Sequence, residues 1–118
     1  MPAFAMAYDA VLADRIRTEL AGASGVTEKK MFGGLAFLVR GNMAIAASGQ
    51  GGLLVRVDPD HTEKLVKTTP ARVMVMRGRS MPGWLRLAAD EVSTKRALAK
   101  WVEMSTTYAR SLPAKKKS

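Results

Sequence analysis

The residue types best suited to chemistry lie around the single histidine, His61. It stands beside Asp58 and Asp60, where a helix is predicted to begin at Pro59, so a metal site or a general base is one interpretation. The other is a solvated helix start, in which the two carboxylates stabilise the positive end of the helix dipole. One imidazole and no cysteine supply few metal ligands, so the sequence favours the helix start.

Two other patterns resemble chemical motifs but have simpler structural explanations. Asp90 and Glu91 are adjacent carboxylates, yet adjacent helical residues do not face each other, and both fit the start of a helix. The glycine-rich residues 49–52 are not followed by Lys-Ser or by a predicted helix, as a phosphate-binding loop would be. We therefore predict no catalytic residue, no metal site and no cofactor, and a protein that is not an enzyme.

Several cations surround a predicted loop over residues 78–83, with Trp84 directly after it. Arginines beside an aromatic side chain could hold phosphate and stack a base. The alternative, which we favour, places Trp84 in the core and the arginines in solvent. Two lysines would join the surface if their strand lies near the loop. The candidate contacts for nucleic acid or another anion are Arg77, Arg79, Arg86, Lys29 and Lys30.

The charge and the cysteine content indicate the compartment of the protein and the kinds of molecule that it meets. The 118 residues carry a net charge of +9, and the rest of the chain keeps +6 without the three lysines at 115–117. A basic protein meets nucleic acid and anionic surfaces faster, without recognising either specifically. Absence of cysteine fits a reducing compartment, and no apolar run reaches the roughly 20 residues that span a bilayer. We expect a cytoplasmic protein with no membrane partner.

Hydrophobic periodicity predicts one α+β domain over residues 1–112, followed by a basic flexible tail over residues 113–118. The order α-β-β-β-α-β-β-α, with short hairpin connections, predicts a largely antiparallel five-stranded sheet with helices packed on it. The expected helices cover residues 9–21, 59–68 and about 90–111. The expected strands cover residues 28–40, 43–48, 53–57, 72–76 and 84–87.

The predicted hairpin around a Gly41-Asn42 loop is apolar on both faces. One face is expected to carry Leu38, Met43 and Ile45, and the other Leu35, Phe37 and Val39. A sheet with one wet face normally alternates apolar and polar residues, so this hairpin needs a cover on both sides. Methionines at positions 31, 43, 74 and 76 fit either core packing or partner binding. The expected partner is a second copy, forming a homodimer, or another protein.

The hairpin also carries a family resemblance. The run Met31-Phe32-Gly33-Gly34, a strand, Gly41-Asn42-Met43, and a later segment with glycine, methionine and tryptophan together resemble the TfoX/Sxy N-terminal domain family, over roughly residues 8–112. That family includes regulators of bacterial competence. The resemblance implies a non-enzymatic regulatory or protein-interaction module, linked to competence or transcription. Nucleic-acid binding through the basic loop and tail is the alternative. The matching positions are Met31, Phe32, Gly33, Gly34, Gly41, Met43, Gly78, Met81 and Trp84.

Overall fold

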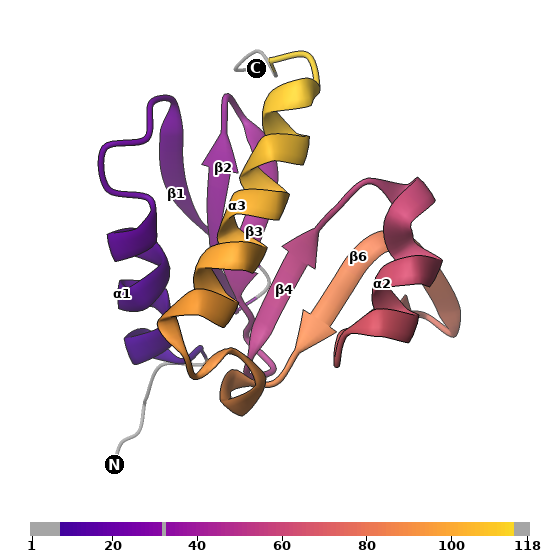
Figure 1. Cartoon of the computed structure of the whole chain (residues 1–118). Coiled ribbons are helices and arrows are strands. Elements are labelled where there is room, and N and C mark those ends of the chain that lie inside the picture. The colour runs from indigo at the N-terminus through magenta and orange to yellow at the C-terminus, as the bar shows by residue number, and fades with distance from the viewer. Residues whose placement is uncertain (1–7, 32, 115–118) are drawn as a thin grey trace.

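The computed structural model describes residues 8–31 and 33–114, which form an antiparallel sheet with helices on one of its faces (Figure 1). The strand order is β1-β2-β3-β4-β6-β5. The strands are β1 (Val26–Met31), β2 (Gly34–Val39), β3 (Asn42–Ala47), β4 (Leu53–Arg56), β5 (Arg72–Met76) and β6 (Arg79–Leu87). The helices are α1 (Ala10–Glu19), α2 (Thr62–Thr68) and α3 (Lys95–Ser111), with short 3-10 helices η1 (Pro59–His61) and η2 (Ala89–Val92) before the last two. The predicted α+β class and antiparallel sheet are confirmed.

The sheet has six strands in the described residues rather than the expected five, because the predicted strand 28–40 is a hairpin of β1 and β2. Gly33 has a φ of +77°, a conformation that costs glycine little, and the chain reverses there. At Gly34 the chain passes close to β3, and a Cβ at this position would lie 2.5 Å from the carbonyl oxygen of Ala47. Gly33 therefore allows the chain to turn, and Gly34 allows β3 to pack closely against β2.

The β2–β3 turn lies one residue earlier than the predicted Gly41-Asn42 loop. Val39 pairs with Asn42, so Arg40 and Gly41 form a two-residue loop, with φ values of +52° and +84°. Positive φ at both positions is typical of the turn type that matches strand twist in hairpins. The predicted loop was wrong because Asn42 is already in the strand, where its side-chain amide donates to the carbonyl oxygen of Pro113 at 2.9 Å.

A bulge then shifts the register between β2 and β3. Phe37 pairs with Ile45 but Leu38 pairs with Met43, so Ala44 is an extra residue between the two pairs. Ile45 consequently faces the same side as Phe37. The predicted face shared by Leu38 and Ile45 was wrong, because a bulge moves every later side chain relative to the regular alternation.

The last strand is longer than expected, and it includes residues 79–83 of the predicted loop 78–83. Only Arg77 and Gly78 separate β5 from β6, since Met76 pairs with Arg79. Between Val73 and Met74 the register shifts, and residues 82–84 become extra residues of β6. Pro82 lies in this bulge, where proline's missing N–H does not interrupt a ladder.

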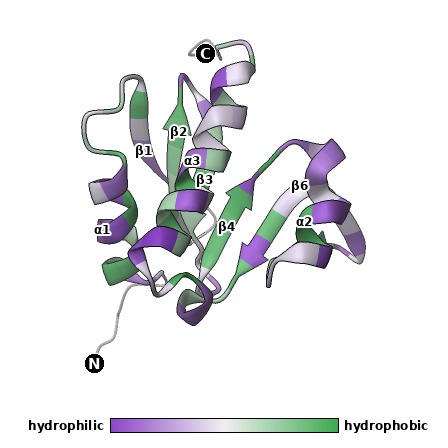
Figure 2. Ribbon diagram, viewed as in Figure 1, coloured by the Kyte–Doolittle hydropathy of each residue, from purple (hydrophilic) through white to green (hydrophobic). Residues whose placement is uncertain are grey.

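One core lies between the sheet and the helices. Leu12, Ile16 and Leu20 of the first helical segment and Leu98, Trp101 and Val102 of α3 pack against buried strand residues such as Phe37, Val55 and Leu85. In Figure 2 the ribbons of β2 and β4, which α3 crosses or adjoins, are mostly in hydrophobic colours. Val11 on α1 is 70% exposed, because it lies outside the stripe of Leu12, Ile16 and Leu20 that faces the core. None of the helices in residues 8–31 and 33–114 could span a bilayer.

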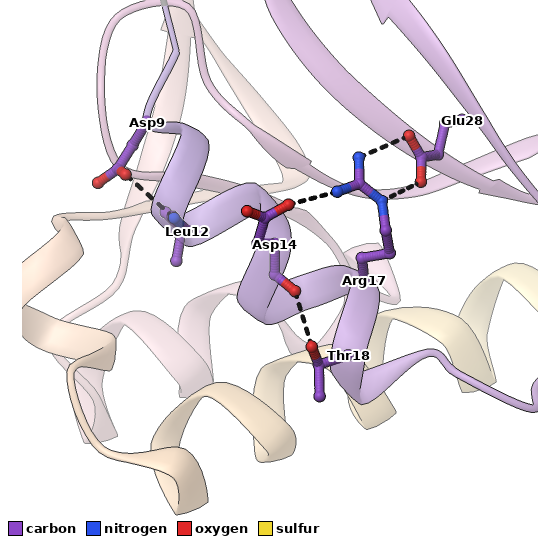
Figure 3. A network of polar contacts seen from close by, with 6 residues as sticks. All are labelled: Asp9, Leu12, Asp14, Arg17, Thr18 and Glu28. Atoms are coloured by element: carbon purple, nitrogen blue, oxygen red, sulfur yellow. Dashed lines mark hydrogen bonds and ion pairs between the residues drawn. The ribbon is translucent and has the colours of Figure 1, made fainter.

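Polar contacts fasten α1 to the sheet edge (Figure 3). The carboxylate of Asp9 accepts the backbone N–H of Leu12 at 3.0 Å, which caps the N-terminus of α1. Arg17 donates to both carboxylate oxygens of Glu28 on β1, at 2.6 and 2.8 Å, and also contacts Asp14. These hydrogen bonds lower the pKa of the Glu28 carboxyl.

Candidate binding site on the open face of the sheet

The face of the sheet opposite the helices carries a hollow of about 1070 Å³. Its apolar lining includes Leu38 and Leu54 and small residues of the central strands. Five methionines from four strands also line the hollow, and none of them belongs to the buried core. A methionine side chain is flexible and adapts easily to an irregular surface. These methionines are Met31, Met43, Met74, Met76 and Met81.

The hollow is cationic: its lining residues include Lys29, Arg56 and Arg86 but no aspartate or glutamate. Arg86 lies opposite Arg72 across β5 and β6, a like-charge pair that repels. Arg72 has the Glu91 carboxylate at 3.4 Å, whereas Arg86 donates to the neutral hydroxyl of Ser48 at 3.1 Å. Within the described residues, Arg86 therefore has no carboxylate at ion-pair distance.

Arg56 is held by aromatic rings rather than by an acid. Its guanidinium carbon lies 5.2 Å from the ring centroid of Trp84 and 5.7 Å from that of Tyr108 on α3. Arg56 pairs with Trp84 across β4 and β6, and Arg86 lies two residues beyond Trp84. Such diagonal neighbours on one face of a sheet are typically about 7–8 Å apart. Two partly buried arginines, neither with a carboxylate at ion-pair distance among the described residues, thus line the same apolar hollow.

The structure separates the five cations that the sequence grouped together. Lys29 and Arg86 line the hollow, but Lys30 alternates to the other side of β1. Arg77 and Arg79 are exposed at the β5–β6 turn, at the opposite end of β6 from Arg86.

The predicted core position of Trp84 was also wrong, since this side chain is partly buried on the open face, where the regular β4–β6 register pairs it with Arg56. Arg56 itself was not predicted as a site residue. Alternation along β4 puts it on the face opposite Val55, but only the strand register reveals its aromatic neighbours.

The candidate chemical groups lie at helix starts. His61 is exposed, and Asp58 accepts the backbone N–H of Asp60 at 2.9 Å at the start of η1. Glu91 accepts the N–H of Ala88 at 2.7 Å, and this bond, with help from Arg72, lowers the pKa of the Glu91 carboxyl. Among residues 8–31 and 33–114, no three His, Cys, Asp or Glu side chains gather where they could hold a metal ion.

The residues that carry the family resemblance concentrate at the hollow. Phe32 lies outside the described residues. Gly33 and Gly78 lie in turns with positive φ. The other six motif positions all line the hollow: Met31, Gly34, Gly41, Met43, Met81 and Trp84.

Fold and hollow together define a small two-layer α+β module whose helices leave one apolar, cationic sheet face open. A model of the TfoX N-terminal domain matches residues 18–109. The chain belongs to the TfoX N-terminal domain family, as its motifs predicted. No curated protein matches the chain significantly.

Proposed function

We propose that this protein is a non-enzymatic regulatory module of the cytoplasm, acting in competence or transcription regulation, and that it binds a segment of a partner protein in the hollow. The observation that carries the proposal is the apolar composition of the open face. A water-facing face of an antiparallel sheet is normally polar, and a contiguous exposed apolar patch marks an interaction site.

The charge of the hollow specifies the chemistry of the partner. Arg56 and Arg86 are partly buried and lack a carboxylate among the described residues, so a carboxylate from outside would gain charge-assisted hydrogen bonds from them. The methionines around them accommodate apolar side chains of varied shape. The partner segment is therefore acidic and apolar at once.

A second copy of the chain fits the hollow less well. Two open faces brought together would set Lys29, Arg56 and Arg86 against the same three cations, with no acid from either lining. Like charges brought together at an interface disfavour that partner by several kcal/mol, on the order of 2–4. The partner in the hollow is thus a different protein.

Single-stranded nucleic acid is the alternative, because it also seeks cations and an aromatic platform. Base stacking needs an accessible ring face, and the Arg56 guanidinium already lies over Trp84. The three cations could still contact phosphates, but a phosphate backbone offers no apolar groups to pack against the methionines. Protein is therefore the occupant that we propose.

The proposal is tested by a photo-crosslinking amino acid in place of Leu54, inside the cells that make the protein. We expect a discrete adduct with another protein, linked through a peptide that contains Asp or Glu. The purified partner should then bind Arg56→Ala and Arg86→Ala about tenfold more weakly, in line with loss of one charged contact each. Arg77→Ala, which changes a cation outside the hollow, serves as the matched control.

The same crosslinker at Val11, exposed on α1, gives the background. Adducts shared by both positions, an adduct with a second copy, or an adduct with nucleic acid would each overturn the proposal. So would a partner that binds Arg86→Ala and wild type equally.

A further inference from the structure

The outer edge of β5 ends the sheet, and we propose that it pairs with β5 of a second copy to form a closed two-fold dimer. Val75 is 59% exposed and Met76 43% exposed on this strand. Large apolar side chains on an edge strand, beside unpaired backbone groups, form a template for another strand. This inference is independent of the proposed use of the hollow.

The two edges of the sheet differ in protection. The edge strand β1 carries Glu28, Lys29 and Lys30, and charged residues on an edge discourage pairing with another chain. Residues 73–76 contain no charge, no proline and no bulge within β5 itself. Of the two sheet edges, only β5 is therefore suited to pairing with another strand.

The outward-pointing backbone N–H and C=O groups of β5 are spaced so that a second copy of the strand could pair with them. Met76 and Arg79 flank the two-residue turn, so in the regular antiparallel alternation Met76 and Met74 direct their N–H and C=O groups toward β6. Those of Val73 and Val75 point outward. A two-fold axis at Met74 sets Val73 opposite Val75 of the second copy, and these residues exchange hydrogen bonds in both directions.

This register uses all five residues of β5 and sets no two like charges directly opposite each other. Arg72 lies opposite Met76 of the second copy, and Met74 lies opposite its own counterpart. A register centred one residue later would leave Arg72 beyond the paired segment. The sequence of the edge is thus self-complementary.

The geometry also limits the assembly to two chains. A head-to-tail contact between β5 and β1 would propagate into a filament, but pairing of β5 with itself uses the same strand on both sides and closes. The two-fold axis is perpendicular to the sheet, so both hollows open on the same side. Met74 and Met76, which line the hollow, then adjoin the interface.

Sedimentation equilibrium tests the dimer, with wild type, Val75→Lys and Val75→Pro. Wild type should have twice the 12.7 kDa chain mass, at low and high salt alike, because backbone hydrogen bonds and apolar contacts hold the interface. Proline at position 75 removes an N–H that β6 does not use, and lysine adds an edge charge. Both variants should sediment at 12.7 kDa. Val11→Lys, a matched change at an exposed valine of α1, should remain a dimer.

Wild type at the mass of one chain up to millimolar concentration would overturn the inference, as would folded Val75 variants that remain dimers. If the proline variant fails to fold, amide hydrogen exchange of the wild-type protein tests the pairing without any substitution. The Val75 amide should exchange more slowly as protein concentration rises, whereas exchange independent of concentration would contradict the pairing. The Leu54 crosslink should persist in the monomeric Val75→Lys variant, so the two proposals fail separately.

Discussion

The guanidinium group of Arg56 lies 5.2 Å from the ring centroid of Trp84, on the face of the sheet that no helix covers. The other tryptophan, Trp101, is 3% exposed on the buried side of α3. The chain therefore has one indole in a cationic, accessible environment and one shielded from solvent. This difference makes the hollow visible to spectroscopy.

Fluorescence quenching should reveal the charge of the hollow. Iodide should quench Trp84 more strongly than caesium does, because the neighbouring arginines attract the anion. Trp84→Phe should leave a weakly quenched signal from Trp101. In Arg56→Gln combined with Arg86→Gln, the preference for iodide should disappear. Equal quenching by both ions in wild type would contradict a cationic site around Trp84.

Gly34→Ala should destabilise the fold through a backbone clash. The added Cβ would lie 2.5 Å from the carbonyl oxygen of Ala47 and 2.9 Å from the backbone nitrogen of Gly49. Relief requires moving β2 away from β3, so we expect a loss of about 2–3 kcal/mol in the free energy of unfolding, measured in urea.

Gly22→Ala provides the control for that substitution. Gly22 has a φ of +87° but nothing within 4 Å of an added Cβ, so only backbone strain of about 1 kcal/mol is expected. Equal losses for the two variants would show that β2 and β3 tolerate a side chain between them.

The Glu28 carboxyl predicts a pH dependence of stability. Arg17 lowers its pKa below the ordinary value of 4.5, so the ionised form stabilises the folded state. This contribution is complete above the ordinary pKa and is lost as pH falls through the lowered one. Both side chains are substantially exposed, so wild type should exceed Glu28→Gln by only about 0.5 kcal/mol at neutral pH. Urea unfolding should show that advantage vanishing in acid. An advantage that grows in acid would contradict the assignment.

Duplex DNA should bind weakly and through charge alone. The cations at Arg77, Arg79 and Arg86 do not form one patch, so no specific DNA interface is expected. Binding should rest on contacts with phosphates, and its affinity should therefore fall steeply with salt. A chain ending at Ala114 lacks three lysines and should bind more weakly still. Titration of fluorescent duplex at low and near-physiological salt measures both effects. Persistent binding by the shortened chain at the higher salt would favour the nucleic-acid alternative.

Arg77→Asn should stabilise the β5–β6 turn. Arg77 has a φ of +53°, a region that asparagine tolerates better than arginine does. The expected gain in the free energy of unfolding is about 0.5 kcal/mol. Because Arg77 lies outside the hollow, partner binding should not change. A loss of stability would contradict this prediction and would indicate that the Arg77 side chain makes a stabilising contact that asparagine cannot replace.

Much of the secondary structure could be predicted because its causes are local. Asp9 and Pro59 start helices, residues 72–76 alternate as a strand, and the four-residue spacing of Leu12, Ile16 and Leu20 marks a buried helical stripe. The motif glycines and methionines likewise identified the family, since they are read directly from the chain.

The hollow was decided by the tertiary structure. Strand pairing determines which side chains become neighbours: the β2–β3 bulge returns Ile45 to the core, and the β4–β6 register sets Trp84 beside Arg56. Periodicity cannot locate an extra residue in a strand, because the bulge depends on which strand packs alongside. The sequence alone determined the elements and the excess of cations. Strand pairing decided which cations meet on the open face, because residues distant along the chain become neighbours only through register.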